Sequence, residues 1–259
     1  LVLDEADRML DMGFADEINA LLAQLPDARQ TLLFSATFND GVYQLAKSRL
    51  RDPQRIEVAP RNSTAREIEQ RVYAVDNERK AELVSHLIRV KGYQPVLIFS
   101  RTRQGCDKLA QQLLPQGVQA QALHGDLSQA AREKVLQSFR DGTLQALVAT
   151  DVAARGLDIP ELNYVLNLEL PHVAEDYVHR IGRTGRAGKK GLAITLFSAE
   201  DALRLEEVEA ALDQRLPQQW FPGFEPDLTK SAPDPRRHSK TAQKQRAKKR
   251  ALGSKGNKR

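Results

Sequence analysis

The sequence predicts an α/β protein built on a doubly wound parallel sheet, with more than one hydrophobic core. Short apolar runs such as Val96 to Phe99 alternate with helical patterns along most of the chain, which is typical of βαβ units. The chain has 259 residues, more than one typical domain of roughly 150 residues. Its apolar runs are far shorter than the ~18 residues that a membrane span needs, so we expect no membrane contact.

Residues 1–59 predict only part of an α/β domain. Strands are expected at Leu1 to Leu3 and at Thr31 to Phe34, and helices at Leu10 to Leu25 and at Val42 to Leu50. Two strands are too few to close a core of this kind. Residues 60–67 carry little apolar pattern, and we expect them to form a linker.

Residues 68–216 predict a complete doubly wound domain. The expected strands are 68–75, 96–99, 119–123, 146–149, 164–168 and 192–197, and the expected helices are 79–90, 103–114, 129–140, 174–181 and 199–212. Residues 217–229 mix aromatic residues with prolines, so we expect an extended strap that packs on this domain.

The charge of the chain is unevenly distributed. Residues 230–259 contain 12 Lys or Arg and one acidic residue, out of 39 basic and 34 acidic residues overall, so this tail carries +11 and the rest of the chain −6. We expect the tail to be disordered, either as an arm that binds nucleic acid or as a solvated end. The single cysteine, Cys106, excludes an intramolecular disulfide and a cysteine-rich zinc site, and it indicates a cytoplasmic protein.

Acidic and hydroxyl side chains follow the two strands of the first region. Asp4, Glu5 and Asp7 come directly after an apolar strand, at the position where parallel sheets bind ligands, and such carboxylates suit Mg²⁺ and an attacking water. Ser35 and Thr37 follow the next strand and could hydrogen-bond those carboxylates. The alternatives are an acidic first turn of the following helix and an ordinary strand-to-helix cap.

Three polar segments end strands of the second region. VLIFSRTR carries Ser100 and Arg101, HGD carries Gly125 before a helix, and ATDVAARGLDIP is a loop dense in polar groups. Backbone amides at such positions hold phosphates, and glycine lets the backbone approach a ligand closely. A turn with an N-cap is an equally good interpretation of HGD taken alone.

The segment YVHRIGRTGRAG is the strongest signal in the chain. His179, Arg183 and Arg186 would share one face of a helix, but Gly182 and Gly185 indicate that the helix breaks there. In either case guanidinium groups stand at a flexible helix end, where they could stabilise charge that develops in phosphoryl transfer. The alternative is a solvated basic helix end.

Taken together, VLDEAD, SAT, VLIFSRTR, HGD with Gln129 and Arg132, ATDVAARGLDIP and HRIGRTGR resemble the DEAD-box ATP-dependent RNA helicases of superfamily 2, in particular the bacterial RhlE-type subgroup. The resemblance covers Leu1 to Leu216. It implies a partial RecA-like domain, a complete RecA-like helicase C-terminal domain and a basic tail. It also implies ATP and Mg²⁺ as cofactors and RNA as partner, and it leaves open ribosomal or RNA-decay assemblies as further partners.

The resemblance assigns nucleotide chemistry to five residues. Asp4 would contact Mg²⁺, Glu5 would activate the attacking water, and Asp158 would contact the ribose. Arg183 and Arg186 would act as arginine fingers.

The resemblance assigns the remaining roles to coupling and to RNA. Asp7 and His179 would meet across a cleft between the domains, and Ser35 and Thr37 would couple hydrolysis to strand separation. The positions that would line the RNA backbone are Ser100, Arg101, Gly125, Thr150, Arg155 and Gly156.

The sequence departs from the family pattern because it has no G-x-x-x-x-G-K-[ST] phosphate loop and no upstream glutamine motif. We therefore expect an N-terminally truncated fragment that by itself neither binds ATP tightly nor hydrolyses it. The leading hypothesis for the whole protein is an ATP-dependent RNA helicase. The alternatives are a non-catalytic RNA-binding module and a DNA-directed helicase, and the DEAD and TDVAARGLD segments weaken the latter.

Overall fold

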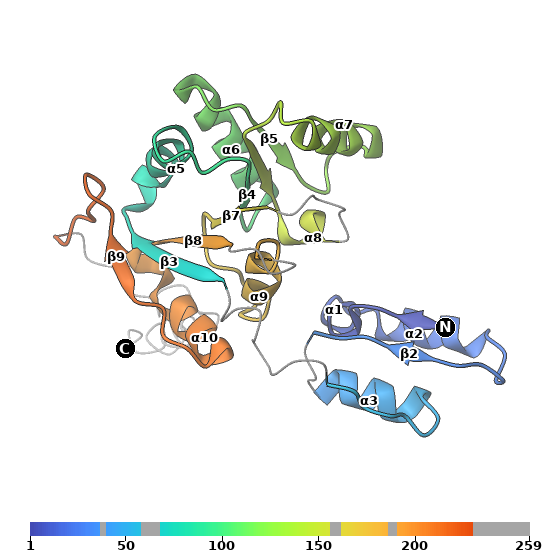
Figure 1. Cartoon of the computed structure of the whole chain (residues 1–259). Helices are drawn as coiled ribbons and strands as arrows, with labels where there is room; N and C mark the ends of the chain where they lie inside the picture. Colours follow the sequence, from blue (N-terminus) through green and yellow to red (C-terminus); the bar gives the residue numbers. More distant parts are fainter. Residues whose placement is uncertain (37–39, 58–67, 156–161, 186–190, 230–259) are drawn as a thin grey trace, which may run out of the picture. The chain divides into compact units, whose positions relative to one another are not determined.

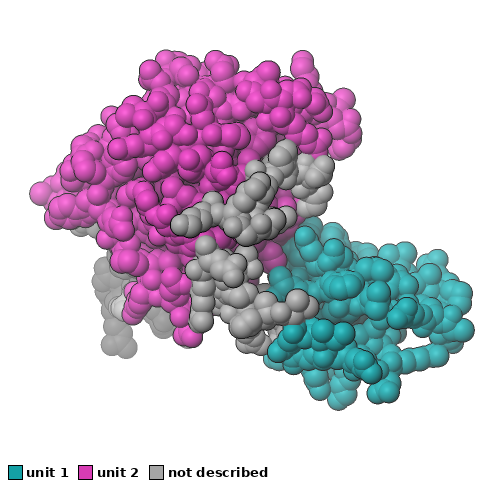
Figure 2. All heavy atoms as spheres, in the orientation of Figure 1, with its two compact units in different colours: residues 1–63 teal, residues 64–259 magenta. Residues whose placement is uncertain are grey.

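The computed structural model describes residues 1–36, 40–57, 68–155, 162–185 and 191–229 (Figure 1). The chain forms two compact units, Leu1–Ser63 and Thr64–Arg259 (Figure 2). Their boundary falls inside the segment 60–67 that the sequence predicts as a linker. Thr37, Gly156, Asp158, Arg186 and the basic tail lie outside the described residues. Within the described ranges, no helix has the length and apolar character needed to cross a membrane.

The described residues of the first unit form two short strands and three helices. Strands β1 (Val2–Leu3) and β2 (Leu32–Leu33) pair in parallel, and they accompany helices α1 (Ala6–Asp11), α2 (Ala15–Ala23) and α3 (Asp40–Arg49). Among its described residues, Ile18, Leu22 and Leu45 form a small buried hydrophobic cluster.

The prediction of one helix from Leu10 to Leu25 is wrong, because the structure has two helices there. Helix α1 ends at Asp11, and Gly13 adopts a left-handed backbone with φ +82°. The amide of Gly13 donates to the carbonyl of Leu10 at 2.9 Å, and the amide of Phe14 donates to that of Met9 at 3.0 Å. These two bonds form a Schellman motif, a common way to end a helix at glycine.

The second unit contains a seven-stranded parallel sheet with the order β5-β6-β4-β7-β8-β3-β9 (Figure 1). The strands are β3 (Glu69–Ala74), β4 (Val96–Phe99), β5 (Ala120–Leu123), β6 (Ala146–Ala149), β7 (Tyr164–Asn167), β8 (Leu192–Phe197) and β9 (Gln218–Trp220). Because all pairs are parallel, the polar residues that follow β4, β6 and β7 stand at one edge of the sheet.

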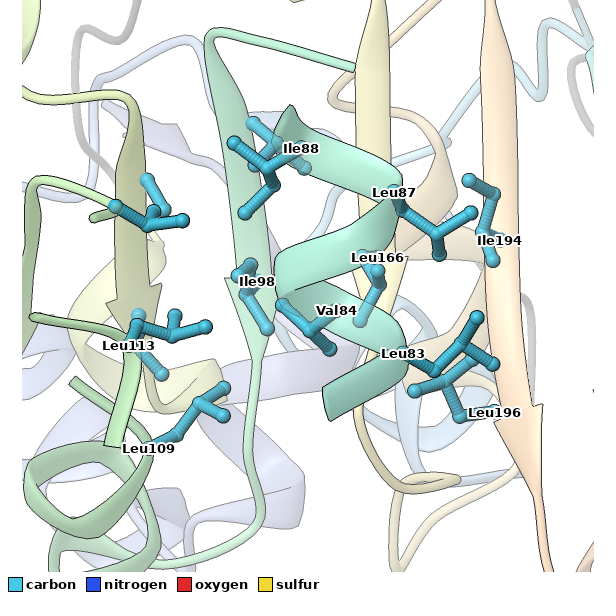
Figure 3. Packing of buried hydrophobic residues seen from close by; sticks show 14 of the residues in the cluster. Leu83, Val84, Leu87, Ile88, Ile98, Leu109, Leu113, Leu166, Ile194 and Leu196 are labelled. Carbon is cyan, nitrogen blue, oxygen red and sulfur yellow. The ribbon is translucent and has the colours of Figure 1, made fainter. Parts of the chain in front are cut away.

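Helices cover both faces of this sheet, as the doubly wound prediction requires. They are α5 (Lys80–Arg89), α6 (Arg103–Leu113), α7 (Gln129–Arg140), α8 (Asp151–Ala154), α9 (Asp176–Ile181) and α10 (Ala202–Leu212), with 3-10 turns η1 (Asn77–Arg79), η2 (Leu114–Gln116) and η3 (Ala199–Asp201). Ile98 of β4 packs with α5 and α6 (Figure 3), whereas its neighbours Leu97 and Phe99 pack with α7 and α8. Alternate strand residues point to opposite faces, so the two helix pairs lie on opposite sides. The predicted fold class is confirmed.

The segment 217–229 is more integrated than a strap. Residues Gln218–Trp220 form β9, which pairs in parallel with β3, and a strand was not predicted here. Phe221 and Phe224 are buried, and the Phe221 ring meets Tyr73 edge-on at 5.2 Å between centroids. The segment therefore contributes an edge strand and part of the core.

A buried ion pair joins the start of α5 to the end of η3. The Lys80 ammonium lies 3.1 Å from the Asp201 carboxylate, and the two side chains are only 4% and 3% exposed. Asp201 also accepts hydrogen bonds from the amide and the hydroxyl of Ser198, which closes a capping box at η3. Burial raises the pKa of Asp201, but the charge of Lys80 and these hydrogen bonds outweigh burial and leave that pKa below its ordinary value.

Candidate functional site

The acidic turn of the first unit has an unusual backbone. Glu5 is the N-cap of α1 and adopts the left-handed conformation, with φ 51° and ψ 47°. Its amide donates to the Asp4 carboxylate at 2.9 Å, and the amide of Ala6 donates to the Phe34 carbonyl at 3.0 Å. Such strain in a non-glycine residue costs about 1–3 kcal/mol and concentrates at functional sites. The turn leaves Asp4 and Glu5 exposed at the end of β1.

The two sequence motifs of the first unit meet in the structure. Asp7 is only 3% exposed, and its amide donates to the Ser35 hydroxyl at 3.3 Å. The Asp7 carboxylate in turn accepts from the Arg8 amide at 2.9 Å. The hydroxyl of the second motif thus contacts the backbone of the acidic turn.

The donor set at this turn fits a metal ion that is shared with phosphate. Among the residues that the structure describes, no group of three or more His, Cys, Asp or Glu could hold a metal. Mg²⁺ usually binds through one or two carboxylates while it keeps waters and takes phosphate oxygens. Asp4 supplies one exposed carboxylate and therefore suits this kind of site, but not a cage built from protein alone.

At the carboxyl edge of the second unit, Glu169 ties together the ends of β4 and β7. Ser100 is fully buried, and its hydroxyl donates to the Glu169 carboxylate at 3.1 Å. The amide of Arg101 donates to the same oxygen at 2.9 Å, while the Arg101 side chain stays 21% exposed. A Cβ atom on Gly105 would lie 2.4 Å from the Ser100 hydroxyl, so glycine lets α6 approach this point. Ser100 and Arg101 were both predicted to bind RNA, and of these two only Arg101 reaches the surface.

The HGD turn is fixed by its histidine. His124 is 4% exposed, and its Nε2 lies 3.0 Å from the Asp107 carboxylate, while Asp126 forms an ion pair with Arg103. Gly125 is exposed, and a Cβ atom there would meet only the Arg103 guanidinium, at 3.8 Å. Packing within the protein does not require glycine at this position.

The loop after β6 begins with a short helix that was not predicted. The Thr150 hydroxyl caps α8 by accepting from the Ala153 amide at 3.4 Å. Arg155 then forms an ion pair with Asp176 at the start of α9, and both side chains are nearly buried, at 12% and 10% exposed. One guanidinium nitrogen of Arg155, Nη1, is buried and has no hydrogen-bond partner within the described part of the chain.

Arg180 is the most heavily bonded side chain at this edge. It is 1% exposed, and it donates to both carboxylate oxygens of Asp151 at 2.6 and 2.7 Å. Its remaining bonds go to the Asn167 side chain at 3.2 Å and to the Glu169 carbonyl at 2.7 Å. The guanidinium also lies 5.1 Å from the centroid of the Phe99 ring. One arginine thus joins α8, α9 and the ends of β4 and β7.

The sequence motifs do not single out this group of residues. They point to the face with His179 and Arg183, and Arg180 lies between these two residues in the sequence. The signal was present, because Arg180 follows Tyr177 by three residues and precedes Ile181, and both of these neighbours are fully buried. A cation on a buried helix face requires an acidic partner, and Asp151 directly follows a predicted strand.

The strongest sequence signal ends in a tight turn. Helix α9 ends at Ile181, and Gly182 is its C-cap. The helix therefore breaks at the glycines and does not continue through Arg183. Arg183 follows and lines a small pocket with Arg155, His179 and Arg180. Beyond it Gly185 has φ +69°, and a Cβ atom on Gly191 would lie 2.4 Å from the Gly185 nitrogen. Two chain segments therefore cross closely just after Arg183.

Two arginines, Arg101 and Arg204, place positive charge near His172. Partial burial, followed by the positive charges of Arg101 and Arg204, lowers the pKa of His172 below its ordinary value. Positive charge that disfavours a protonated imidazole also attracts anions.

Comparisons with known proteins agree with these features. Residues 1–46 match the family DEAD/DEAH box helicase, and residues 79–188 match the family Helicase conserved C-terminal domain. The chain is 42% identical over 216 residues to the DEAD-box ATP-dependent RNA helicase CshA of Geobacillus kaustophilus. The aligned region covers 83% of this chain and 46% of that protein. The chain thus spans about half the length of this curated relative.

Solved structures lead to the same family. The E. coli DEAD-box protein SrmB bound to the regulator of ribonuclease activity A is 36% identical with a TM-score of 0.60, over 64% of this chain and 98% of that chain. The S. cerevisiae protein Dbp5 bound to RNA and ADP BeF3 is 33% identical with a TM-score of 0.74, over 84% of this chain and 58% of that one. The ordered motifs, the fold and these similarities establish that the chain belongs to the DEAD-box ATP-dependent RNA helicase family.

Proposed function

We propose that the chain supplies the RNA-binding edge and part of the nucleotide site of an ATP-dependent RNA helicase. The observation that carries this proposal is the position of Arg183. It follows a helix that buried ion pairs hold in place, and it shares a pocket with Arg155 and His179. An arginine held in this way is suited to stabilise the charge that develops on a transferred phosphoryl group.

In the nucleotide site, Asp4 would hold Mg²⁺ together with phosphate oxygens, and Glu5 would orient and deprotonate the attacking water. Bound ATP would supply the phosphoanhydride that is cleaved, and Mg²⁺ would offset the negative charge of its phosphates. Asp158 would contact the ribose, and Arg183 and Arg186 would stabilise the phosphates. The exposed carboxylates of the left-handed turn at Glu5 support this assignment.

On the RNA side, Arg101, Gly125, Thr150, Arg155 and Gly156 would follow the phosphate backbone along the carboxyl edge of the sheet. Ser100 would act from beneath, because it holds the Glu169 carboxylate that also binds the Arg101 amide. The positive charges of Arg101 and Arg204 near His172 and the relative Dbp5, solved with RNA and ADP BeF3, support this path.

For coupling, Asp7, Ser35, Thr37 and His179 would transmit closure of the two units to the RNA. The bond between Asp7 and Ser35 supports the first half of this link. We also propose that the protein is of the RhlE type and works in the cytoplasm. RNA-decay or ribosomal assemblies are proposed partners, and the relative SrmB, solved with a regulator of ribonuclease activity, supports the former.

RNA binding is testable with the chain itself. Fluorescence anisotropy with single-stranded RNA and with DNA of the same sequence should give tighter binding to RNA. Arg101→Ala should weaken RNA binding, whereas Arg215→Ala, at an exposed position remote from the carboxyl edge in sequence, should not. Equal affinity for both nucleic acids would favour the DNA-directed alternative, and no binding at all would refute the RNA path.

Catalysis requires the missing nucleotide motifs, so it is best tested in a chimera. In it, this chain replaces the matching region of the G. kaustophilus relative CshA, which leaves the upstream part of that protein in place. The chimera should show an RNA-stimulated ATPase, and Arg183→Ala should abolish turnover while RNA binding persists. Unchanged turnover in Arg183→Ala would contradict the role of this arginine.

The second candidate is a non-catalytic RNA-binding module. One observation favours it for the chain as given, namely that no phosphate loop occurs in its 259 residues. An inactive chimera whose RNA affinity equals that of the isolated chain would support the module over the motor.

A further inference from the structure

Four polar side chains with no role in the proposed chemistry form a continuous chain beneath α9. Asn167 of β7, Thr195 of β8 and Tyr177 of α9 are each 0% exposed. Asn167 and Thr195 are register partners on adjacent strands, and the Asn167 amide nitrogen lies 3.1 Å from the Thr195 hydroxyl. The Tyr177 hydroxyl lies 3.3 Å from Thr195 and 3.0 Å from the Gln70 side-chain oxygen.

The donor inventory gives this chain one direction. Arg180 can only donate, so the oxygen of the Asn167 amide accepts from it and the nitrogen of that amide is left to donate to Thr195. The Tyr177 hydroxyl has one proton, which goes to Gln70. In the contact between the two hydroxyls, Thr195 is therefore the donor and the Tyr177 oxygen is the acceptor. The bonds run head to tail from Arg180 to Gln70 on β3, and such chains strengthen each bond.

Apart from Arg180, the members of this chain of bonds are neutral. Burial raises the pKa of Tyr177 to about 12, although the hydrogen bond from Thr195 and the charge of Arg180 oppose that rise. Tyr177 therefore remains a protonated donor at neutral pH, and Arg180 is the only charged member.

Helix α9 depends on such contacts for its position. It has six residues, and isolated helices shorter than about 12 residues are marginal in water. Three of its four buried side chains make polar contacts, and the fourth, Ile181, is apolar. Asp176 pairs with Arg155, Tyr177 joins the chain of bonds, and Arg180 pairs with Asp151. Directional bonds fix the rotation of a helix more tightly than apolar packing does, because their strength depends on angle.

We propose that Asn167, Thr195 and Tyr177 are positioning residues for the reaction, because they hold Arg180 and α9 so that Arg183 meets the phosphates. The inference rests on the proposed function, which assigns the phosphate contact to Arg183. It adds three residues that touch neither ATP nor RNA in that assignment. The same bonds connect the end of α9, where Arg183 lies, to Gln70 near the start of β3.

The test uses substitutions that remove single hydroxyls with little change of shape. Thr195→Val breaks the chain of bonds in its middle, Tyr177→Phe breaks it near its end, and Thr195→Ser keeps the hydroxyl. Tyr164→Phe is the matched control, because it also removes a phenol hydroxyl. Tyr164 lies on β7, the strand that carries Asn167, but it packs on the side of the sheet that α5 and α6 cover.

In the CshA chimera, Thr195→Val and Tyr177→Phe should lower kcat of the RNA-stimulated ATPase by about tenfold, the equivalent of one lost hydrogen bond in the transition state. RNA affinity should stay within about twofold, since the bonds of Arg101 are untouched. Thr195→Ser and Tyr164→Phe should keep kcat near that of the unmodified chimera. Unchanged kcat in Thr195→Val, with a lowered unfolding temperature, would reduce the chain of bonds to a stabilising role and overturn the proposal.

A second measurement does not depend on activity. The Gly182 and Arg183 amides donate to the carbonyls of Val178 and Arg180 at 2.9 and 3.1 Å, so their hydrogen exchange reports how firmly the end of α9 is held. In the chain itself, Thr195→Val should speed this exchange about tenfold relative to Tyr164→Phe. Equal exchange in the two variants would overturn the inference. An unmodified chimera without ATPase would instead refute the proposed function.

Discussion

Removal of the Asp151 carboxylate should destabilise the second unit more than any surface change. In Asp151→Ala, Arg180 would keep its bonds to Asn167 and to the Glu169 carbonyl but would lose both bonds to a carboxylate. The guanidinium is 1% exposed and would remain a buried charge without its counter-ion. Breaking a buried pair costs about 3–5 kcal/mol, and we expect the lower end because the other bonds persist.

A loss of about 3 kcal/mol would be a large share of the roughly 5–15 kcal/mol that stabilises a typical domain. The assay is urea unfolding followed by the fluorescence of Trp220. Trp220 is the single tryptophan of the chain and lies in β9, so its signal reports on the second unit. Circular dichroism over the same urea range checks that both probes follow one transition.

Two further variants make this reasoning refutable. Arg103→Ala breaks the ion pair with Asp126, whose side chains are 60% and 59% exposed, and it should cost less than about 1 kcal/mol. The double variant Asp151→Leu with Arg180→Met removes both charges and should regain most of the lost stability. If Asp151→Ala costs no more than Arg103→Ala, the buried pair does not hold this edge together.

Three other expectations follow from the structure. The pKa of Asp201 is lower in the folded chain than in the unfolded one, so its stabilisation is present above the unfolded pKa of about 4 and is lost as pH falls through the folded pKa. Unfolding temperatures measured between pH 3 and 7 should therefore depend less on pH in Asp201→Asn, and parallel curves would contradict this. Gly191→Ala should destabilise the second unit by about 2 kcal/mol or more in urea, because the new Cβ atom would collide with the Gly185 backbone, and a neutral result would show that the crossing is loose. The chain alone should release no phosphate from ATP, with or without RNA, in a colorimetric assay, and RNA-stimulated release would refute the need for a phosphate loop.

Sequence patterns predicted the alternation of strands and helices because each buried strand is a short apolar run with clear limits. They failed where the information lies in a single backbone angle. Gly13 divides the predicted helix Leu10 to Leu25, but a lone glycine inside a helical pattern is also tolerated without a break. They also failed at β9, since Gln218 and Gln219 have no strand-like pattern and pair with β3 through the backbone alone.

The candidate site divides in a similar way. Residues at strand ends, such as Arg101 and Thr150, are predictable because position along a strand fixes where they emerge. Partners in ion pairs are not, because Asp151 and Arg180 are 29 residues apart and only the tertiary fold brings them together. The burial of Ser100 was likewise not predictable, since it depends on Gly105 and on Glu169, which follows β7.

The position of β9 decides where this protein can be divided for experiments. The match to the family Helicase conserved C-terminal domain ends at residue 188, and the helical pattern ends near residue 216. Cutting at 188 would delete β8 and β9, the two strands that pair with β3, and would leave β3 without a partner strand. Cutting at 216 would uncover the pocket that Phe221 and Phe224 fill against Tyr73 and His86. A domain transplant or a tag should therefore be joined beyond Leu228, or the product will expose part of its interior and aggregate.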